Sequence, residues 1–446
     1  MTAIWCELAL VDGRVQPGVL IEITGGRFSG VAVNADAGAA TRLAGFTIPG
    51  LANAHSHAFH RALRSRTQAE RGTFWTWRDL MYRAADRLQP DSYHRLARAV
   101  FGEMTRAGIT CVGEFHYLHH QPDGTPYDDA NEMGRALLHA ADEAGIRITL
   151  LDTIYLHGGL AADGYSAPEG PQRRFADASV EAWASRVEQL ESTDTHRIGA
   201  AIHSVRAVAP PEIRSVGEWA SANEAPVHGH LSEQVAENET CVAHYGSTPT
   251  GLLADAGLLS DHFTAVHATH LEPGDVAALA AGGSTVAMCP TTERDLGDGI
   301  GPTSEFAAAG VPMALGSDSH ATIDILEEAR SLELHERLRS EQRGIHTAAD
   351  LLAMATTNGH RSLGWHDAGE IAVGRRADLV TVALDSVRLA GTDPATAVEA
   401  AVFAANAGDV TDVHVDGRRV VADRRHATLD VAAELDASIK ELMDHG

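Results

Sequence analysis

The segment Pro49-Gly50-Leu51-Ala52-Asn53-Ala54-His55-Ser56-His57 joins an apolar run to two closely spaced histidines. The run over residues 46–54 is typical of a buried strand. In extended backbone, residues two positions apart face the same side, so His55 and His57 can present two imidazoles to one ion. Imidazole is a common ligand of zinc. The chain has 25 histidines, so the pair is informative only because it follows a predicted strand.

Seven further apolar runs follow the first. They alternate with stretches rich in Ala, Glu and Arg that have helical periodicity, such as residues 93–107 and 176–191. This alternation predicts an α/β fold, a (β/α)8 TIM-type barrel over residues 48–368. A doubly wound open sheet is the alternative, but polar residues at the ends of many strands favour the barrel. The eight predicted strands are 46–54, 109–115, 146–153, 198–203, 226–231, 264–268, 284–288 and 313–317.

The two ends of the chain differ from this middle part. Short β segments with glycine turns fill the first ~45 residues, and residues 413–421 predict a hairpin. We therefore expect residues 1–47 and 369–425 to form one small β-sandwich domain built from both termini. Residues 426–446 predict a C-terminal helix.

Composition limits the classes of protein that remain. An apolar fraction of 44% in 446 residues is typical of a globular protein. No run approaches the ~20 apolar residues of a membrane span, and residues 1–10 do not predict a signal peptide. The four cysteines are far apart and argue against a disulfide scaffold or a thiolate zinc site, so we expect a cytoplasmic protein. A net charge of −26 disfavours nucleic-acid and acidic-membrane partners.

Lysine is almost absent from the chain. Lys440, near the C-terminus, is the one lysine in the sequence. A Schiff-base barrel aldolase needs a lysine in its barrel, and so does a binuclear site bridged by a modified lysine. Both classes are excluded.

Three later strands also end in residues that suit metal chemistry. His230 closes the fifth strand as a third candidate ligand, and Glu233 follows where it can reach the reacting water rather than the metal. His267 ends the sixth strand, with His270 as a bystander. Asp318 closes the eighth strand and can offer one oxygen to a metal and one to water. The alternatives are that Glu233 only stabilises a helix N-terminus, that His267 is a core histidine, and that Asp318 is a helix N-cap.

The order of these residues, with Gly369-Glu370-Ile371-Ala372-Val373-Gly374-Arg375-Arg376-Ala377-Asp378-Leu379 after the barrel, resembles the amidohydrolase superfamily over nearly the whole chain. The resemblance implies one Zn²⁺ per chain. The ligands that it implies are His55, His57, His230 and Asp318. The catalytic residues that it implies are Glu233, His267 and Asp318.

Three segments resemble the formimidoylglutamate deiminases in particular. They are Phe74-Trp75-Thr76-Trp77-Arg78-Asp79-Leu80-Met81-Tyr82-Arg83, Glu114-Phe115-His116-Tyr117-Leu118-His119-His120 and His203-Ser204-Val205-Arg206-Ala207-Val208. The resemblance implies hydrolysis of N-formimidoyl-L-glutamate to N-formyl-L-glutamate and ammonia in histidine degradation, by a homodimer. The residues implied for the dicarboxylate substrate are Arg78, Tyr117, His203 and Arg206, together with His60 where the family has Gln.

Arginine is the residue type that this substrate class requires. A chain with a net charge of −26 can bind a dianion only through local cations, and the arginine fork pairs with a carboxylate in a bidentate manner. Two rival functions stay open. A related deaminase of guanine or another heterocycle would have no use for two arginines. A barrel that binds metal structurally or senses a metabolite would leave Glu233 and His267 without a role.

Overall fold

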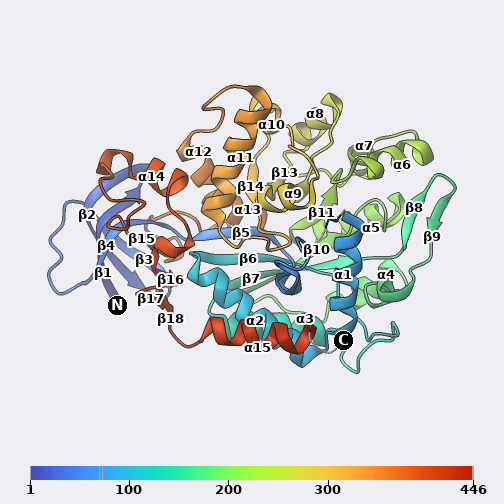
Figure 1. Ribbon diagram of the computed structural model, residues 1–446, viewed down its shortest axis with the longest axis horizontal. Helices are drawn as coiled ribbons and strands as arrows, with labels where there is room; N and C mark the ends of the chain where they lie inside the picture. The colour runs from blue at the N-terminus through green and yellow to red at the C-terminus, as the bar shows by residue number, and fades with distance from the viewer. Residues whose placement is uncertain (1, 70, 73, 444–446) are drawn as a thin grey trace.

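The structure, a computed structural model, describes residues 2–69, 71–72 and 74–443. It contains two eight-stranded sheets, and the barrel sheet has parallel strands in the order β14-β13-β12-β11-β10-β7-β6-β5 (Figure 1). A parallel bridge between Ser56 and Asp318 joins the two outer strands and closes the barrel. The predicted TIM-type barrel is confirmed. Its strands are β5 (Leu51–Ser56), β6 (Ile109–His116), β7 (Arg147–Ile154), β10 (His196–Ile202), β11 (Val227–Leu231), β12 (Phe263–His267), β13 (Thr285–Met288) and β14 (Met313–Leu315).

The predicted first strand is in fact two strands that belong to different sheets. β4 (Thr41–Pro49) lies in the second sheet, here called the terminal sheet, and β5 begins at Leu51 in the barrel. The chain crosses between them at Gly50, where a Cβ atom would lie 2.3 Å from the Thr110 Oγ1 atom. Only glycine fits this crossing, and the apolar run continues through it because both strands are buried.

Helices surround the barrel. Helix α2 (Pro90–Arg106) is amphipathic, and its buried face includes Leu96, Val100 and Phe101. The predicted helix 176–191 is shorter than expected because Ser179 caps it by accepting a hydrogen bond from Ala182 N. In the described part of the chain, no helix is long and apolar enough to span a membrane. The helices are α1 (Phe74–Arg87), α2 (Pro90–Arg106), α3 (Glu132–Ala144), α4 (Val180–Val187), α5 (Pro210–Ala222), α6 (Val235–Tyr245), α7 (Pro249–Asp255), α8 (Pro273–Gly282), α9 (Pro290–Leu296), α10 (Thr303–Ala309), α11 (Ile325–Ser340), α12 (Ala348–Ala353), α13 (Gly359–Ser362) and α14 (Ala397–Phe403).

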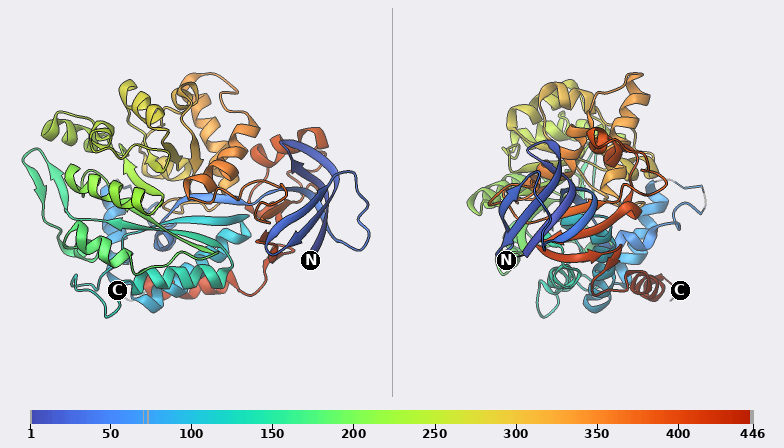
Figure 2. Two further views of the ribbon diagram at one scale, coloured as in Figure 1. Left: turned by 180° about the vertical axis from the view of Figure 1, so that it is seen from behind. Right: turned by 90° about the vertical axis from the view of Figure 1, so that its left-hand side faces the viewer.

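The terminal sheet combines strands from both ends of the chain, as predicted. It is a mixed sheet in the order β18-β17-β16-β15-β4-β1-β2-β3, and the blue and red strands adjoin in Figure 2. Its further strands are β1 (Thr2–Val11), β2 (Arg14–Thr24), β3 (Arg27–Ala32), β15 (Leu379–Val382), β16 (Val410–Val415), β17 (Arg418–Ala422) and β18 (Arg425–His426). The limits 1–47, 48–368 and 369–425 remain our proposal for the domain boundaries, and Met1 lies outside the described residues.

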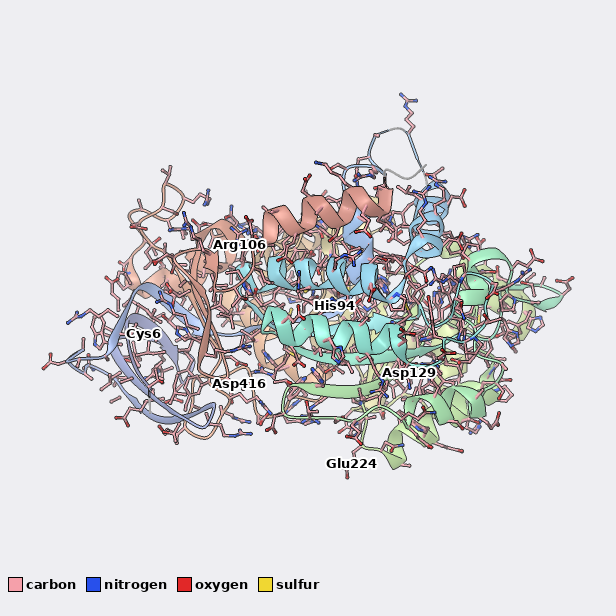
Figure 3. The ribbon with its side chains drawn as sticks, turned by 90° about the horizontal axis from the view of Figure 1, so that it is seen from below. Cys6, His94, Arg106, Asp129, Glu224 and Asp416 are labelled. Atoms are coloured by element: carbon pink, nitrogen blue, oxygen red, sulfur yellow. The ribbon has the colours of Figure 1, made fainter. Side chains whose placement is uncertain are left out.

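Helix α15 (Val431–Met443) lies where the sequence predicts a C-terminal helix, although residues 444–446 are outside the described part. It runs beside α2, with α3 on the other side of α2 (Figure 3). The Arg98 guanidinium on α2 donates to the Glu434 carboxylate on α15 at 2.9 Å. The C-terminal helix therefore packs on the barrel and not on the terminal sheet that precedes it in sequence.

A buried charge cluster joins the terminal sheet to the barrel. Arg147 at the start of β7 is fully buried and pairs in a bidentate manner with Asp378, with Nη1 at 2.9 Å from Oδ1. Asp416, labelled in Figure 3, lies 3.2 Å from the same guanidinium. Figure 1 shows the terminal sheet at one end of the molecule. Helix α1 and the hairpin of β8 (Gly159–Ala161) and β9 (Gly164–Ser166) lie toward the other end.

Candidate metal centre and active site

A pocket of about 270 Å³ opens at the carboxyl ends of the barrel strands. Barrel enzymes place their active sites at this end. The pocket brings together predicted site residues that are up to 261 positions apart, from His57 to Asp318. His55 lies against its floor and is completely buried. The other predicted residues that line the pocket are His60, Arg78, Tyr117, His203, Arg206, His230, Glu233 and His267.

Three imidazoles and one carboxylate converge on the floor of this pocket. Asp318 Oδ1 lies 3.3 Å from His55 Nε2 and 3.4 Å from His57 Nε2. His230 Nε2 lies 3.2 Å from His55 Nε2. All four side chains are buried. This set of nitrogen and oxygen donors is of the type that binds zinc.

The hydrogen bonds on the far side of two rings show how the rings are oriented. His57 Nδ1 lies 3.0 Å from the Phe115 carbonyl oxygen, and His230 Nδ1 lies 2.8 Å from the His203 carbonyl oxygen. A carbonyl oxygen only accepts, so both Nδ1 atoms donate and both Nε2 atoms keep a lone pair. Metal-binding histidines are commonly fixed in this way.

The charges on this floor fit a cation. Burial lowers the pKa of His55, His57 and His230, which keeps their rings neutral. Burial opposes ionisation of Asp318, but the contributions of His55, His267 and His230 together outweigh burial and lower the pKa of Asp318. The lone pair of His57 Nε2 therefore faces a carboxylate at 3.4 Å, an arrangement that is repulsive unless a positive ion lies between them.

His267 and Glu233 form the wall beside the metal ligands. His267 Nε2 lies 3.8 Å from Asp318 Oδ2 and 3.9 Å from Glu233 Oε1. Burial lowers the pKa of His267, but Glu233, a hydrogen bond to Glu293 and Asp318 together raise it to about 10. Burial also raises the pKa of Glu233. A raised carboxyl pKa beside a polar pocket suits a group that takes up and returns a proton.

Backbone strain marks three of the strand ends that carry these residues. His267 has φ +69° and Asp318 has φ +40°, both in the left-handed region that non-glycine residues rarely adopt. Ser232, directly before Glu233, has φ +49°. Strain of this kind persists where the surrounding structure holds a side chain in a required position, and it is concentrated at functional sites.

Arginine side chains occupy the other end of the pocket. Arg206 follows β10, and its Nε atom lies 2.9 Å from Glu237 Oε2, while Nη2 lies 3.7 Å from Glu233 Oε2. Arg78 reaches the pocket from α1, with its guanidinium carbon 5.3 Å from the centre of the Tyr82 ring. Burial, followed by the charges of Arg206 and Arg78, lowers the pKa of His203 to about 3. Both guanidinium groups therefore lie near His203, in the same part of the pocket.

Tyr117 and His60 form a bonded pair in the pocket. His60 Nε2 lies 2.9 Å from the Tyr117 hydroxyl. Burial lowers the pKa of His60 to about 3, so its ring is neutral. His60 is therefore in a position to hydrogen-bond within the pocket.

Four pocket or support residues escaped the sequence interpretation. Glu293 follows the predicted strand 284–288 and contacts His267, whereas Glu237 looks like an ordinary residue of a helix surface. Tyr155 comes two residues after the predicted strand 146–153, and an aromatic residue at that place is a usable signal. Gln172 lies in a 3₁₀ turn, η2 (Gly170–Arg174), for which the sequence holds no comparable signal.

A second buried group of side chains could be mistaken for a metal site. His116, His119 and Asp152 come within reach of one ion. However, Arg186 binds both oxygens of Asp152, with each nitrogen–oxygen distance at 2.8 Å. The carboxylate is already paired with a cation, so this cluster is a structural network.

Comparisons with known proteins agree with this geometry. The model of the amidohydrolase family matches residues 46–420. A formimidoylglutamate deiminase from Pseudomonas aeruginosa is 38% identical over 441 residues, which cover 96% of each chain. A 5-methylthioadenosine/S-adenosylhomocysteine deaminase from Moorella thermoacetica is 30% identical over 406 residues, 90% of this chain and 87% of that one. The crystal structure of an amidohydrolase from Brucella melitensis, 34% identical, superposes with a TM-score of 0.92 and covers 99% of this chain and 100% of that one.

Proposed function

Because the chain belongs to the amidohydrolase family and is a metal-dependent hydrolase, we propose that it hydrolyses N-formimidoyl-L-glutamate to N-formyl-L-glutamate and ammonia. The observation that carries this proposal is the pocket itself. Arg206 and Arg78 lie in the same cavity as the histidine and aspartate cluster. A small dicarboxylate with a reactive C=N bond fits this cavity, because its carboxylates can pair with the arginines while its C=N group reaches the cluster. The 38% identity to a formimidoylglutamate deiminase over 96% of the chain supports the same substrate.

We propose that the cluster holds one Zn²⁺ per chain. Its ligands are His55, His57, His230 and Asp318, whose donor atoms converge on the pocket floor. Zinc in such a site supplies Lewis-acid chemistry and makes water a nucleophile near neutral pH.

The protein groups next to the cluster then handle the proton. Asp318 Oδ2 and His267 Nε2 lie 3.8 Å apart and orient the attacking water at the formimidoyl carbon. Glu233 takes up a proton from that water and delivers it to the imine nitrogen. The second proton of the water then follows the same route through Glu233, the carbon–nitrogen bond breaks, ammonia leaves, and the new carbonyl oxygen comes from water. The nitrogen attached to glutamate stays in the product as an amide.

The arginines give the substrate its orientation. Arg206, with His203 and Tyr117, holds one carboxylate, and Arg78 holds the other. His60 supports this subsite through its hydrogen bond with Tyr117. A deaminase of a heterocycle would leave both arginines without a carboxylate, so the pocket favours the dicarboxylate. The reaction belongs to histidine degradation, and a homodimer remains a prediction.

Identification of the products tests the proposal. The zinc-loaded protein is incubated with N-formimidoyl-L-glutamate, and ammonia and organic products are measured by an enzymatic assay and mass spectrometry. The proposal predicts equal amounts of ammonia and N-formyl-L-glutamate. Glutamate with formamide would show that the other carbon–nitrogen bond is cleaved and would contradict it.

A further inference from the structure

The Gln172 side chain has a fixed orientation beside the pocket. Its Oε1 atom lies 3.0 Å from the Glu169 backbone N–H, and its Nε2 atom lies 2.8 Å from the Gly158 carbonyl oxygen. A backbone N–H only donates and a carbonyl oxygen only accepts. The amide oxygen therefore faces Glu169 and the amide nitrogen faces Gly158.

This orientation determines the role of a neighbouring hydroxyl. Gln172 Nε2 lies 3.0 Å from the Tyr155 hydroxyl oxygen and 3.3 Å from that of Tyr82. An amide nitrogen donates and does not accept, so Tyr155 accepts this hydrogen bond. Among the described residues, Gln172 is the hydrogen-bond partner of the Tyr155 hydroxyl. The hydroxyl proton of Tyr155 is consequently left to meet a ligand.

Tyr155 is placed where a substrate carboxylate would lie. It directly follows β7, is 4% exposed, and lines the pocket. Its ring packs edge-on against His203 with the ring centres 4.9 Å apart. Burial raises the pKa of Tyr155 far above its usual value, although Arg206 and Arg78 lie near enough to lower it in part. The phenol keeps its proton and can donate it in a hydrogen bond.

We propose that Tyr155 is a further substrate-binding residue, whose hydroxyl donates a hydrogen bond to the substrate carboxylate that Arg206 holds. This inference rests on the proposed dicarboxylate substrate and adds a neutral donor that the matching motifs do not include. A buried donor without an acceptor is costly, so the free pocket is suited to a ligand that supplies an acceptor at this place. A purely structural role for Tyr155 would use the ring and the hydrogen bond from Gln172, so loss of the hydroxyl would then lower stability without raising KM.

The test compares two matched tyrosine variants of the zinc-loaded protein. Tyr155→Phe removes only the hydroxyl and should raise KM for N-formimidoyl-L-glutamate by about 10- to 100-fold, with kcat changed by less than about threefold. Tyr165→Phe is the control because its hydroxyl already donates to the Val205 carbonyl at 2.9 Å. It should leave KM unchanged.

A second variant reverses the direction of the hydrogen bond. Glutamate in Gln172→Glu would accept the Tyr155 proton and withdraw it from the substrate. We expect KM to rise by a factor similar to that of Tyr155→Phe. The double variant should be no worse than the more impaired single variant, because both changes remove the same hydrogen bond. Independent, multiplicative effects would contradict the inference.

Calorimetry with N-formyl-L-glutamate separates this inference from the proposed function, because it needs no turnover. Weaker binding to Tyr155→Phe, by about 10-fold or more, supports a hydroxyl that meets a carboxylate even if ammonia release shows that the reaction is a different one. Equal affinity of Tyr155→Phe and the unmodified protein would overturn the inference, and so would an unmodified protein that does not bind this dicarboxylate.

Discussion

His267 Nδ1 lies 3.3 Å from Glu293 Oε1, and this contact turns the opposite ring nitrogen toward the pocket. Glu293 is buried, and the same oxygen also accepts from Cys289 N at 2.9 Å. The carboxylate thus ties the ring to the backbone of the next strand end. His267 keeps its strained backbone and its ring orientation through this support.

Replacing Glu293 should affect turnover without removing the metal. Glu293→Leu deletes the acceptor, and kcat should fall by about 10- to 100-fold, as is typical when the support of a metal-site histidine is lost. Glu293→Gln keeps an acceptor oxygen at the same place and should retain most of the activity. Steady-state kinetics with zinc analysis distinguish the two variants. Equal loss in both would mean that the charge matters and not the orientation.

Metal content should follow the four proposed ligands. The purified protein should carry about one zinc-like ion per chain, and His57→Ala or Asp318→Ala should lose both the ion and the activity. His270→Ala is the control, because His270 lies near the site but outside the pocket lining. Elemental analysis is the measurement, and two tightly held ions per chain would contradict a mononuclear site.

Proton transfer by Glu233 can be separated from metal binding. Glu233→Gln preserves the shape of the side chain but cannot carry a proton. We expect kcat to fall by about 10²-fold or more while zinc is retained. Loss of zinc in this variant would identify Glu233 as a ligand.

The buried pair of Asp152 and Arg186 should stabilise the fold in a pH-dependent way. Burial alone would raise the pKa of Asp152, but Arg186 lowers it to about 2, below the ordinary value. The stabilisation is therefore complete above about pH 4, the ordinary aspartate pKa, and declines as pH falls toward 2. Asp152→Asn at pH 7 removes one of the two carboxylates that pair with the buried Arg186 guanidinium and leaves Asp177, 2.8 Å away, as its remaining ionic partner, so it should lower the free energy of unfolding by about 1.5–3 kcal/mol.

Urea unfolding at several pH values measures this effect. The difference between the unmodified protein and Asp152→Asn should shrink as the medium is acidified. Asp436→Asn is the control, since its pair with Lys440 is exposed, and an exposed pair contributes less than about 1 kcal/mol. A difference that did not change with pH would indicate a packing effect.

The sequence predicted the parts of the site that depend on local patterns. His55, His57 and Asp318 stand at strand ends, and the spacing that places them there is short-range. The partners that support site residues come from other segments of the chain. Glu293, for example, contacts His267 across 26 positions. The same limit explains the first strand, because the exchange of sheets at Gly50 depends on side chains more than 50 positions away.

The substrate arginines offer the sharpest test of specificity. Arg206→Met and Arg78→Met should each lower kcat/KM for N-formimidoyl-L-glutamate by about 10- to 100-fold, because each removes a charge-assisted hydrogen bond. Residual activity should be measurable in each single variant, since the other arginine still holds one carboxylate. The two effects need not be additive because both residues orient one molecule.

Ammonia release from three compounds tests whether the enzyme is specific for a dicarboxylate. The unmodified zinc-loaded protein is assayed with N-formimidoyl-L-glutamate, with its neutral diamide, and with guanine. We predict efficient turnover of the diacid, poor turnover of the diamide, and little further loss with the diamide when Arg206 or Arg78 is replaced. Equal turnover of diacid and diamide, or faster release of ammonia from guanine, would contradict a dicarboxylate-specific deiminase.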